Sequence, residues 1–234
     1  MDGIMALGTG LIGAETRRVE IAGQNIANVA TPGYKRAVAF RDVLGTSADA
    51  MGKSASADTV ATDFSAGKLI HTGNPFDLAI NGPGFFEVAT TDGPAYTRLG
   101  AFQRDASGRL VTSQGWPLQG SAGDIKVSSD AWRVERDGTV IDGGNSVGAV
   151  NIVDFAKTAE LKRTADGLFV SNGAAATPVD AAQLSQGYIE ASNVSVAQDM
   201  LQMMEAMRRV ESGQKLIHVY DDMMGAAIQR LGEM

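Results

Sequence analysis

The sequence predicts an α+β protein whose N- and C-terminal helices pair as a coiled-coil-like core domain, with an all-β, hairpin-rich domain inserted between them. An apolar repeat marks each end of the 234-residue chain, and short strand-like segments separated by glycine turns fill its middle. From these observations we expect a discontinuous helical core domain (1–36 and 192–234), an extended connector (37–75) and a β domain (76–191).

The first repeat predicts an amphipathic helix. Apolar side chains recur every seven residues, at Met5, Ile12, Val19 and Ile26. Several glycines interrupt this helix, and each costs up to about 1 kcal/mol relative to alanine in a helix interior. The helix should therefore be weak alone and depend on a partner.

Pro32 and Gly33 predict where this helix ends. Proline disfavours the α conformation in the residue before it, and a Pro-Gly pair suits the centre of a type II turn. The helix should thus end near Asn28 or Ala30. We expect the residues around the turn to be structural and not to bind a small molecule. These residues are Asn25, Asn28, Thr31, Pro32, Gly33 and Tyr34.

The middle of the chain changes character near residue 76. Residues 42–75 are rich in Ala, Ser, Thr, Gly and Asp, which predicts an extended, poorly structured connector because few side chains could form a core. Strand candidates then follow at 77–80, 85–88, 109–112 and 150–153. Asp-Gly, Ser-Gly and Asn-Gly pairs recur between them, as is typical of hairpins.

The second repeat, which begins near Asn193, is the longest in the chain. Steps of three and four residues alternate through Val196, Met200, Met203, Met207, Val210, Gln214, Ile217, Asp221, Met224, Ile228 and Leu231. A helix of this length would be ~60 Å long. Packing against the N-terminal helix would cover part of it. Because the C-terminal helix should be the longer of the two, its far end needs apolar cover from copies of the molecule or its relatives.

The composition argues against several classes of site. The chain has 20 basic and 27 acidic residues, a net charge of −7, and no basic patch of the kind that binds nucleic acid. It has no cysteine, which excludes disulfides, thiolate catalysis and cysteine-ligated metals. His71 and His218 lie far apart in the sequence, so we expect no metal site.

The N-terminal segment does not have the pattern of a secretory signal. Such a signal begins with a positively charged region, whereas the first basic residue here is Arg17. No segment approaches the ~18–20 uninterrupted apolar residues of a membrane span. We expect a soluble protein that stays in the cytoplasm or leaves it by a route without cleavage.

One motif favours an enzyme, and its context argues against that interpretation. Gly8, Gly10 and Gly13 fit the Gly-x-Gly-x-x-Gly dinucleotide fingerprint. The fingerprint must follow a buried strand and precede an acidic residue by about 20 positions. Hardly any strand-like sequence comes before it, and no acidic residue lies between Glu20 and Asp42. We expect no cofactor, no small-molecule substrate and no catalytic residue.

Three stretches resemble the flagellar rod and hook proteins of bacteria. The first is Asn-Ile-Ala-Asn-Val-Ala-Thr-Pro-Gly-Tyr-Lys-Arg at residues 25–36. The second, at 63–112, contains Gly-Asn-Pro-Phe-Asp-Leu-Ala-Ile and Gly-Pro-Gly-Phe-Phe-Glu-Val. The third is Gly-Tyr-Ile-Glu-Ala-Ser-Asn-Val at 187–194, which leads into the second repeat. Each motif is long and specific.

The resemblance implies a structural subunit of the flagellar basal-body rod, with no enzymatic activity. Its paired helices would form the inner core of the shaft, and its β domain would lie on the outer surface. Its partners would be other rod proteins and copies of itself, with transient contact to the export apparatus. It would reach the periplasmic part of the rod through flagellar type III export, without a cleaved signal. The chain length is closest to that of proximal-rod members, with a distal-rod or hook subunit as the alternative.

The two repeats then predict the assembly surface. We expect an interface made by Ile12, Val19, Ile26, Met200, Met203, Met207, Val210, Ile217, Met224, Ile228 and Leu231. Methionine is frequent in the second repeat, and its unbranched side chain adapts to neighbours in different environments.

Overall fold

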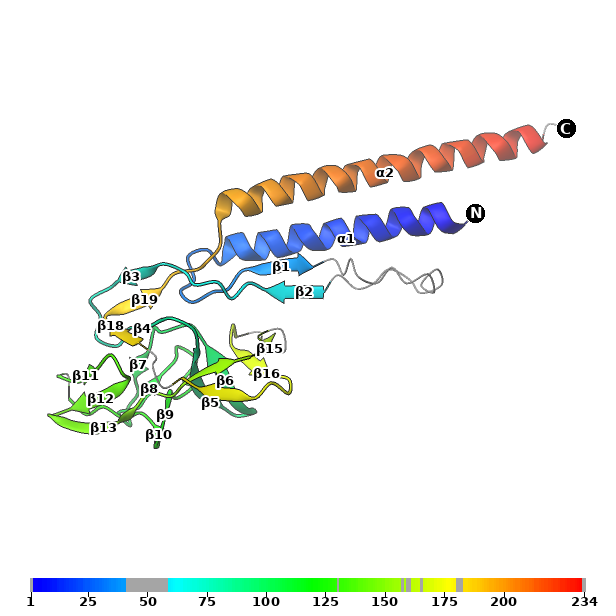
Figure 1. The fold of residues 1–234 in the computed structure, drawn as a ribbon. Helices are drawn as coiled ribbons and strands as arrows, with labels where there is room; N and C mark the ends of the chain where they lie inside the picture. The colour runs from blue at the N-terminus through cyan, green and yellow to red at the C-terminus, as the bar shows by residue number, and fades with distance from the viewer. Residues whose placement is uncertain are drawn as a thin grey trace. The chain divides into compact units, whose positions relative to one another are not determined.

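A computed structural model describes most of the chain. The described residues are 2–40, 59–129, 131–156, 158, 161–164, 166–179 and 183–232. The chain divides into two compact units, which we call the helical unit (residues 1–27, 37–63 and 194–234) and the β unit (residues 28–36 and 64–193). The predicted α+β class is confirmed, because two helices and many short strands form the described chain (Figure 1).

The helical unit contains α1 (Asp2–Ala27) and α2 (Val196–Gly232), with the antiparallel strands β1 (Ala37–Phe40) and β2 (Thr59–Thr62). α1 ends close to the predicted position. α2 begins at Val196, a few residues after the predicted start. The Asn193 side chain makes other contacts before the helix begins. Its oxygen accepts a hydrogen bond from the Arg36 backbone NH at 2.7 Å, and its amide donates one to the Ser65 carbonyl at 3.1 Å.

Glycines set the spacing of α1 and α2, which run side by side (Figure 1). A β-carbon at Gly8 would lie 3.2 Å from Ile217 Cγ1, and one at Gly213 would lie 2.9 Å from Ile12 Cγ1. At each contact the absent side chain lets the partner approach. Gly8, one of the glycines that weaken α1 as an isolated helix, therefore serves its packing on α2.

The segment 37–75, predicted as an extended connector that is poorly structured over 42–75, contains paired strands among its described residues. Its described residues include β1 and β2, and β1 packs on α1. They also include β3 (Leu69–His71), which pairs with β19 (Tyr188–Glu190). Backbone pairing orders these residues despite their small side chains. Residues 41–58 of the predicted connector lie outside the described chain.

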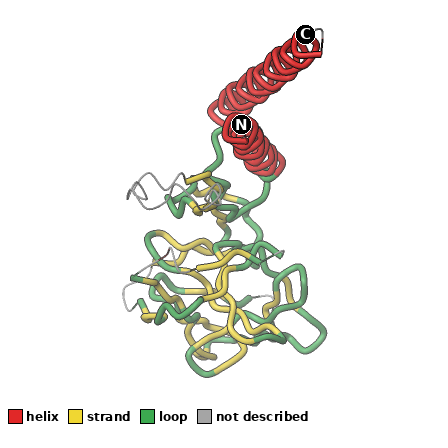
Figure 2. The backbone as a smooth tube through the Cα atoms, turned by 90° about the vertical axis from the view of Figure 1, so that its right-hand side faces the viewer, coloured by secondary structure: helices red, strands yellow, loops and turns green. Residues whose placement is uncertain are grey.

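The β unit is built from short strands joined by loops (Figure 2). Besides β3 and β19, its strands are β4 (Leu78–Asn81), β5 (Phe85–Thr90), β6 (Gly93–Thr97), β7 (Gln103–Arg104), β8 (Leu110–Val111), β9 (Gln119–Gly120), β10 (Gly123–Asp124), β11 (Arg133–Val134), β12 (Thr139–Asp142), β13 (Asn145–Ala149), β14 (Ile152–Phe155), β15 (Leu161–Arg163), β16 (Phe169–Ser171), β17 (Ala176–Pro178) and β18 (Gln183–Gln186). The four strand candidates coincide with β4, β5, β8 and β14 to within a few residues.

The largest sheet of the β unit has the strand order β15-β16-β6-β5-β14-β17. Phe86 pairs with Ile152 across β5 and β14, and both side chains enter one buried cluster. The adjacent pair, Phe85 and Val153, enters a second buried cluster. Since neighbouring residues of a strand point to opposite faces, this sheet is buried on both sides.

Predicted glycine turns join several of the strands. β12 and β13 form a hairpin in which Asp142 pairs with Asn145. The two residues between them, Gly143 and Gly144, have φ of 57° and 85°. Positive φ at both central positions is the requirement of a type I′ turn, and glycine meets it without a steric cost.

Candidate assembly surfaces and the structural turn

The turn after α1 has the predicted geometry. The Tyr34 backbone NH donates to the Thr31 carbonyl at 3.3 Å, and Gly33 has φ of 67°. Pro32 therefore occupies the second and Gly33 the third position of a type II turn. The Thr31 hydroxyl donates to the Asn28 side-chain oxygen at 3.2 Å, which ties the turn to the residues that follow α1.

Gly33 is held tightly within the β unit. Its NH donates to the Glu190 carbonyl at 2.7 Å. A β-carbon here would lie 2.5 Å from the Leu99 backbone nitrogen and 2.7 Å from the Arg98 carbonyl oxygen. Because these neighbours are backbone atoms, they cannot move aside as a side chain can.

Gly33→Ala should therefore destabilise the β unit by more than about 2 kcal/mol, since positive φ alone costs an alanine about 1–2 kcal/mol and the overlap adds to this cost. Urea unfolding would measure the change. Gly167→Ala is the matched control, because Gly167 has a similar φ of 76°, and its added β-carbon would meet no other described residue within 4 Å. Equal losses in the two variants would contradict the proposed steric contribution.

A buried group of three charges, which we call the charge clamp, lies directly after the turn. It consists of Lys35, Arg98 and Glu190, all of them buried. Lys35 Nζ lies 2.7 Å from Glu190 Oε1, and Arg98 Nη1 lies 3.2 Å from Glu190 Oε2. Burial lowers the pKa of Arg98, and the nearby Glu190 carboxylate opposes that shift.

Backbone groups complete the charge clamp. Lys35 Nζ donates to the Ser65 carbonyl at 2.7 Å, and the Gly67 NH donates to Glu190 Oε1 at 2.7 Å. Besides Arg98, three chain positions thus meet at this carboxylate, at 35, 67 and 190. Each lies within a few residues of a point where the chain passes from one unit to the other. The charge clamp therefore links, within the β unit, chain segments that lie next to these boundaries.

Tyr34 packs against Arg163 within the β unit. The Arg163 guanidinium lies 4.4 Å from the centre of the Tyr34 ring, a cation–π contact. Arg163 also donates a hydrogen bond to the Lys35 carbonyl. Sequence reasoning missed Lys35, Arg98 and Glu190 as a group, although all three lie inside or beside the motifs quoted for the family resemblance.

Asn25 joins three elements of the helical unit. Its amide Nδ2 donates to the Ala37 carbonyl at 2.8 Å, and its Oδ1 accepts from the Ala37 NH at 2.9 Å. The same Nδ2 lies 3.2 Å from Asp199 Oδ1 in the first turn of α2. Both side chains are buried. Asn25 thus links α1 to β1 and α2, which is a structural role.

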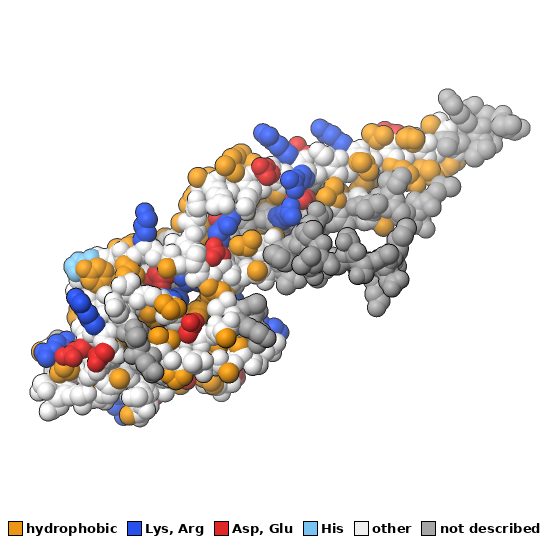
Figure 3. Space-filling view, in the orientation of Figure 1, with side chains coloured by type: hydrophobic (Ala, Val, Ile, Leu, Met, Phe, Trp, Pro, Cys, Tyr) orange, Lys and Arg blue, Asp and Glu red, His pale blue; other side chains and the backbone are white. Residues whose placement is uncertain are grey.

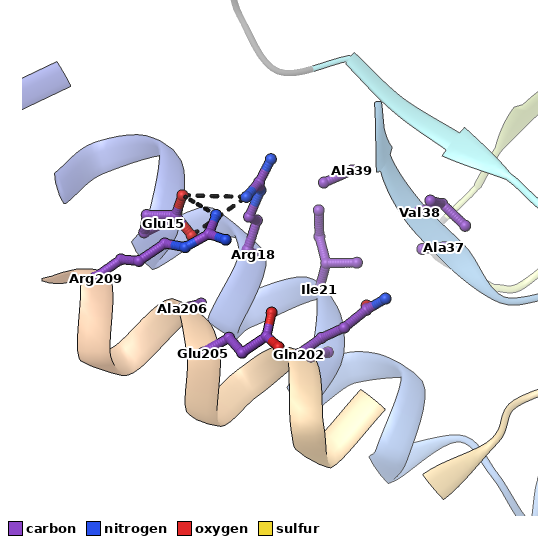
Figure 4. A pocket seen from close by; sticks show the side chains of 11 residues that line it. Glu15, Arg18, Ile21, Ala37, Val38, Ala39, Gln202, Glu205, Ala206 and Arg209 are labelled. Carbon is purple, nitrogen blue, oxygen red and sulfur yellow. Dashed lines mark hydrogen bonds and ion pairs between the residues drawn. The ribbon is translucent and has the colours of Figure 1, made fainter. Parts of the chain in front are cut away.

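A second buried carboxylate connects the helices. Glu15 of α1 lies between Arg18 of α1, at 3.1 Å, and Arg209 of α2, at 3.3 Å (Figure 4). The three side chains line a cavity of about 250 Å³ whose wall also includes Ile21 and Ala206. The sequence signal for this cluster was limited to the spacing of Glu15 and Arg18, because Arg209 is distant in sequence.

The row of α2 residues that faces α1 is offset from part of the predicted repeat. Met203 and Ile217 belong to the repeat and lie close to α1. Between them, however, the contacts use Ala206, which is buried, and Gly213. These small residues let α1 approach, while the predicted Met207 lies one position further round the helix and is 46% exposed.

Several residues of the predicted assembly surface are accessible in the chain. Met200 is 53% exposed and Ile228 is 65% exposed. Val19, Met207 and Val210 line an apolar groove of about 280 Å³ between α1 and α2. Orange hydrophobic side chains are visible along the helices in Figure 3. Ile12, Ile26, Met203, Ile217 and Met224 are half-buried, and the Leu231 side chain lies outside the described structure.

The dinucleotide-like motif lies entirely within α1 (Asp2–Ala27), and no strand precedes it among the residues that the structure describes. Its Gly8 packs against Ile217 of α2. Among the described residues there is no group of three or more His, Cys, Asp or Glu side chains that could hold a metal ion. Nor does the described part of the chain contain a helix that is long and apolar enough to cross a membrane.

Comparisons with known proteins agree on one family. Residues 79–141 match the family model described as the flagellar hook protein FlgE/F/G D1 domain. Residues 185–230 match the model described as the flagellar basal body rod FlgEFG protein C-terminal region. The first match covers much of the β unit, and the second covers most of α2.

Relatives align over nearly the whole chain. The flagellar basal-body rod protein FlgG of Buchnera aphidicola is 34% identical, with 90% of this chain and 93% of the relative covered. FlgF of Caulobacter vibrioides is 32% identical over the full length of both chains. FlgF of Escherichia coli is 32% identical over 99% of each chain. The chain therefore belongs to the flagellar basal-body rod protein family, whose members are structural and not enzymatic, and it is FlgF-like.

Proposed function

We propose that this chain is a structural subunit of the flagellar basal-body rod that polymerises through its terminal helices, which pair as a coiled-coil-like core. The observation that carries the proposal is the apolar surface of α2 that α1 leaves uncovered. Heterologous contacts that do not close into a ring generate open helical filaments, as a shaft requires. Repeated contacts along α2 would provide them.

The packing of α1 on α2 supports this proposal by leaving one end of α2 uncovered. Gly8 lies opposite Ile217, and Ile12 lies opposite Gly213. Continuing this antiparallel register places the start of α1, Asp2, opposite about residue 223 of α2. The residues of α2 after this point extend beyond α1 (Figure 1). We call them the C-terminal extension, and they include Met224 and Ile228.

The apolar groove forms a second part of the proposed assembly surface. It lies between the helices beside Met207, and its walls are mostly apolar. Burying apolar surface contributes roughly 25 cal/mol per Å². We therefore assign both the groove and the C-terminal extension to contacts with neighbouring subunits, as the sequence predicted for Val19, Met207, Val210 and Ile228.

The partners and location follow from the same proposal. Neighbours would be copies of this chain and other rod proteins, with the export apparatus as a transient partner. The chain would reach the periplasmic part of the rod by type III export, without cleavage of a signal. A distal-rod subunit remains the alternative, because FlgG proteins are also similar. The full-length alignment with two FlgF proteins favours the FlgF-like assignment.

Photo-crosslinking in purified basal bodies tests the proposal. A photoreactive amino acid would replace Met207 or Ile228, and Asp137, an exposed residue in a turn of the β unit, would be the control position. We expect covalent adducts to other rod subunits from positions 207 and 228, and weaker adducts from position 137. If incorporated chains gave adducts at 137 alone, the terminal helices would not be the polymerising surface.

A further inference from the structure

We propose that Met200, Met204 and Met207 form a peroxide-sensitive patch, and that oxidation of this methionine patch in the unassembled chain prevents incorporation into the rod. The inference rests on the proposed function, because it needs α2 to become buried between subunits. It adds a modification site and a chemical class of reactant, a hydroperoxide such as hydrogen peroxide.

The three side chains share one flank of α2. They are spaced by four and three residues, which places them within an arc of about 60° on a helix. Met200, Met204 and Met207 are 53%, 50% and 46% exposed. Met207 also lines the apolar groove together with Val19 and Val210. The patch is therefore open to a small solute in the free chain and continuous with the proposed contact surface.

The reaction is a transfer of one oxygen atom. A lone pair of the thioether sulfur attacks one oxygen of hydrogen peroxide, and the O–O bond breaks. The sulfur is oxidised to a sulfoxide, while the other oxygen leaves as hydroxide and takes up the proton released from the transferred oxygen. Methionine and hydrogen peroxide thus give methionine sulfoxide and water, and peroxide is reduced. Sulfoxide reductases reverse the change.

The consequence differs between the free and the assembled chain. Sulfoxidation converts a flexible apolar side chain into a polar one and disrupts methionine-rich interfaces. In the free chain the sulfoxide oxygens of the patch would remain hydrated, so α2 can keep its fold. At a subunit interface they would have to lose water without a matched donor. Oxidation should therefore affect incorporation much more than folding.

The sequence contains an internal control. Met203 lies between Met200 and Met204 in the chain, but it is half-buried, and a β-carbon at Gly23 of α1 would lie 3.5 Å from its methyl carbon. Its sulfur is therefore less accessible than those of the patch, although the same helix carries all four methionines. A difference in oxidation between Met203 and the patch would report structure and not local sequence.

The first arm of the test uses the purified full-length chain and dilute hydrogen peroxide. Peptide mass spectrometry would follow each methionine over time. We expect the three patch methionines to oxidise several-fold faster than Met203, since oxidation follows exposure. Equal rates at all four positions would overturn the proposal, because the patch would then not be a selective site.

The second arm compares two triple variants in cells. Replacing all three methionines by glutamine imitates the polarity and length of the sulfoxide, and replacing them by leucine keeps an apolar surface that peroxide does not oxidise. We expect the glutamine variant to be absent from basal bodies. We expect the leucine variant to be incorporated as the wild type is, and to remain so under peroxide stress that stops wild-type incorporation.

Normal incorporation of the glutamine variant would overturn the inference and leave the proposed function intact. Loss of the leucine variant, with helicity equal to that of the wild type in circular dichroism, would also overturn it, because polarity would then not be the cause. Absence of the unmodified chain from basal bodies would contradict the proposed function itself.

Discussion

Replacing Glu190 by glutamine is expected to reduce the free energy of unfolding of the β unit by about 3–5 kcal/mol, the usual cost of breaking a buried ion pair from one side. Glu190 supplies the one negative charge that pairs with both Lys35 and Arg98, and all three side chains are buried. Glutamine has nearly the same shape but no charge. Burial already lowers the pKa of Arg98, and the variant would lose the carboxylate that opposes this shift.

Urea unfolding followed by tryptophan fluorescence would measure the loss. Both tryptophans of the chain, Trp116 and Trp132, lie in the β unit, so their emission reports that unit. Glu135→Gln is the matched control, because Glu135 is exposed in the same unit, and a surface change costs within about 0.5 kcal/mol. A Glu190→Gln protein as stable as the control variant would show that the charge clamp does not stabilise the fold.

Met207→Asp is expected to abolish incorporation into the rod and motility, while the free chain stays folded. Met207 is 46% exposed in the free chain, so a carboxylate there remains hydrated and costs little. At a dry subunit interface the same carboxylate would have to lose its water, at a cost of several kcal/mol. The substitution separates folding from assembly because Met207 is exposed in the free chain. A carboxylate placed at a position buried against α1 would impair both.

Met207→Leu is the control for this substitution, since it preserves apolar volume and helix propensity. We expect its motility and its amount in basal bodies to equal those of the wild type. Circular dichroism of the two purified variants should show similar helix content. Motile Met207→Asp cells with normal amounts of the chain in their basal bodies would exclude Met207 from the interface.

Local features of the fold were predictable from the sequence because local chemistry determines them. Pro32 and Gly33 restrict the backbone to a narrow set of conformations, and the type II turn was confirmed. The end of α1, the two long helices and the hairpins at Asp-Gly pairs such as Asp142-Gly143 follow from similar local rules. The family resemblance was confirmed independently.

Features that depend on contacts between distant residues could not be predicted. Lys35 and Glu190 are 155 positions apart, and no periodicity connects them. The offset in the α2 repeat has a similar origin. The repeat includes neither Ala206, which is buried, nor Gly213, the small residues at which the two helices approach each other closely. Hydrophobicity alone does not report which residue leaves room for a neighbouring backbone.

A density map of the assembled basal body, at a resolution that shows side chains, tests the central claim most directly. The proposed function predicts that Met207, Met224 and Ile228 each contact a side chain of another subunit, and that the surface of the C-terminal extension is covered. A map in which these three residues touch only their own chain or solvent would contradict assembly through the terminal helices.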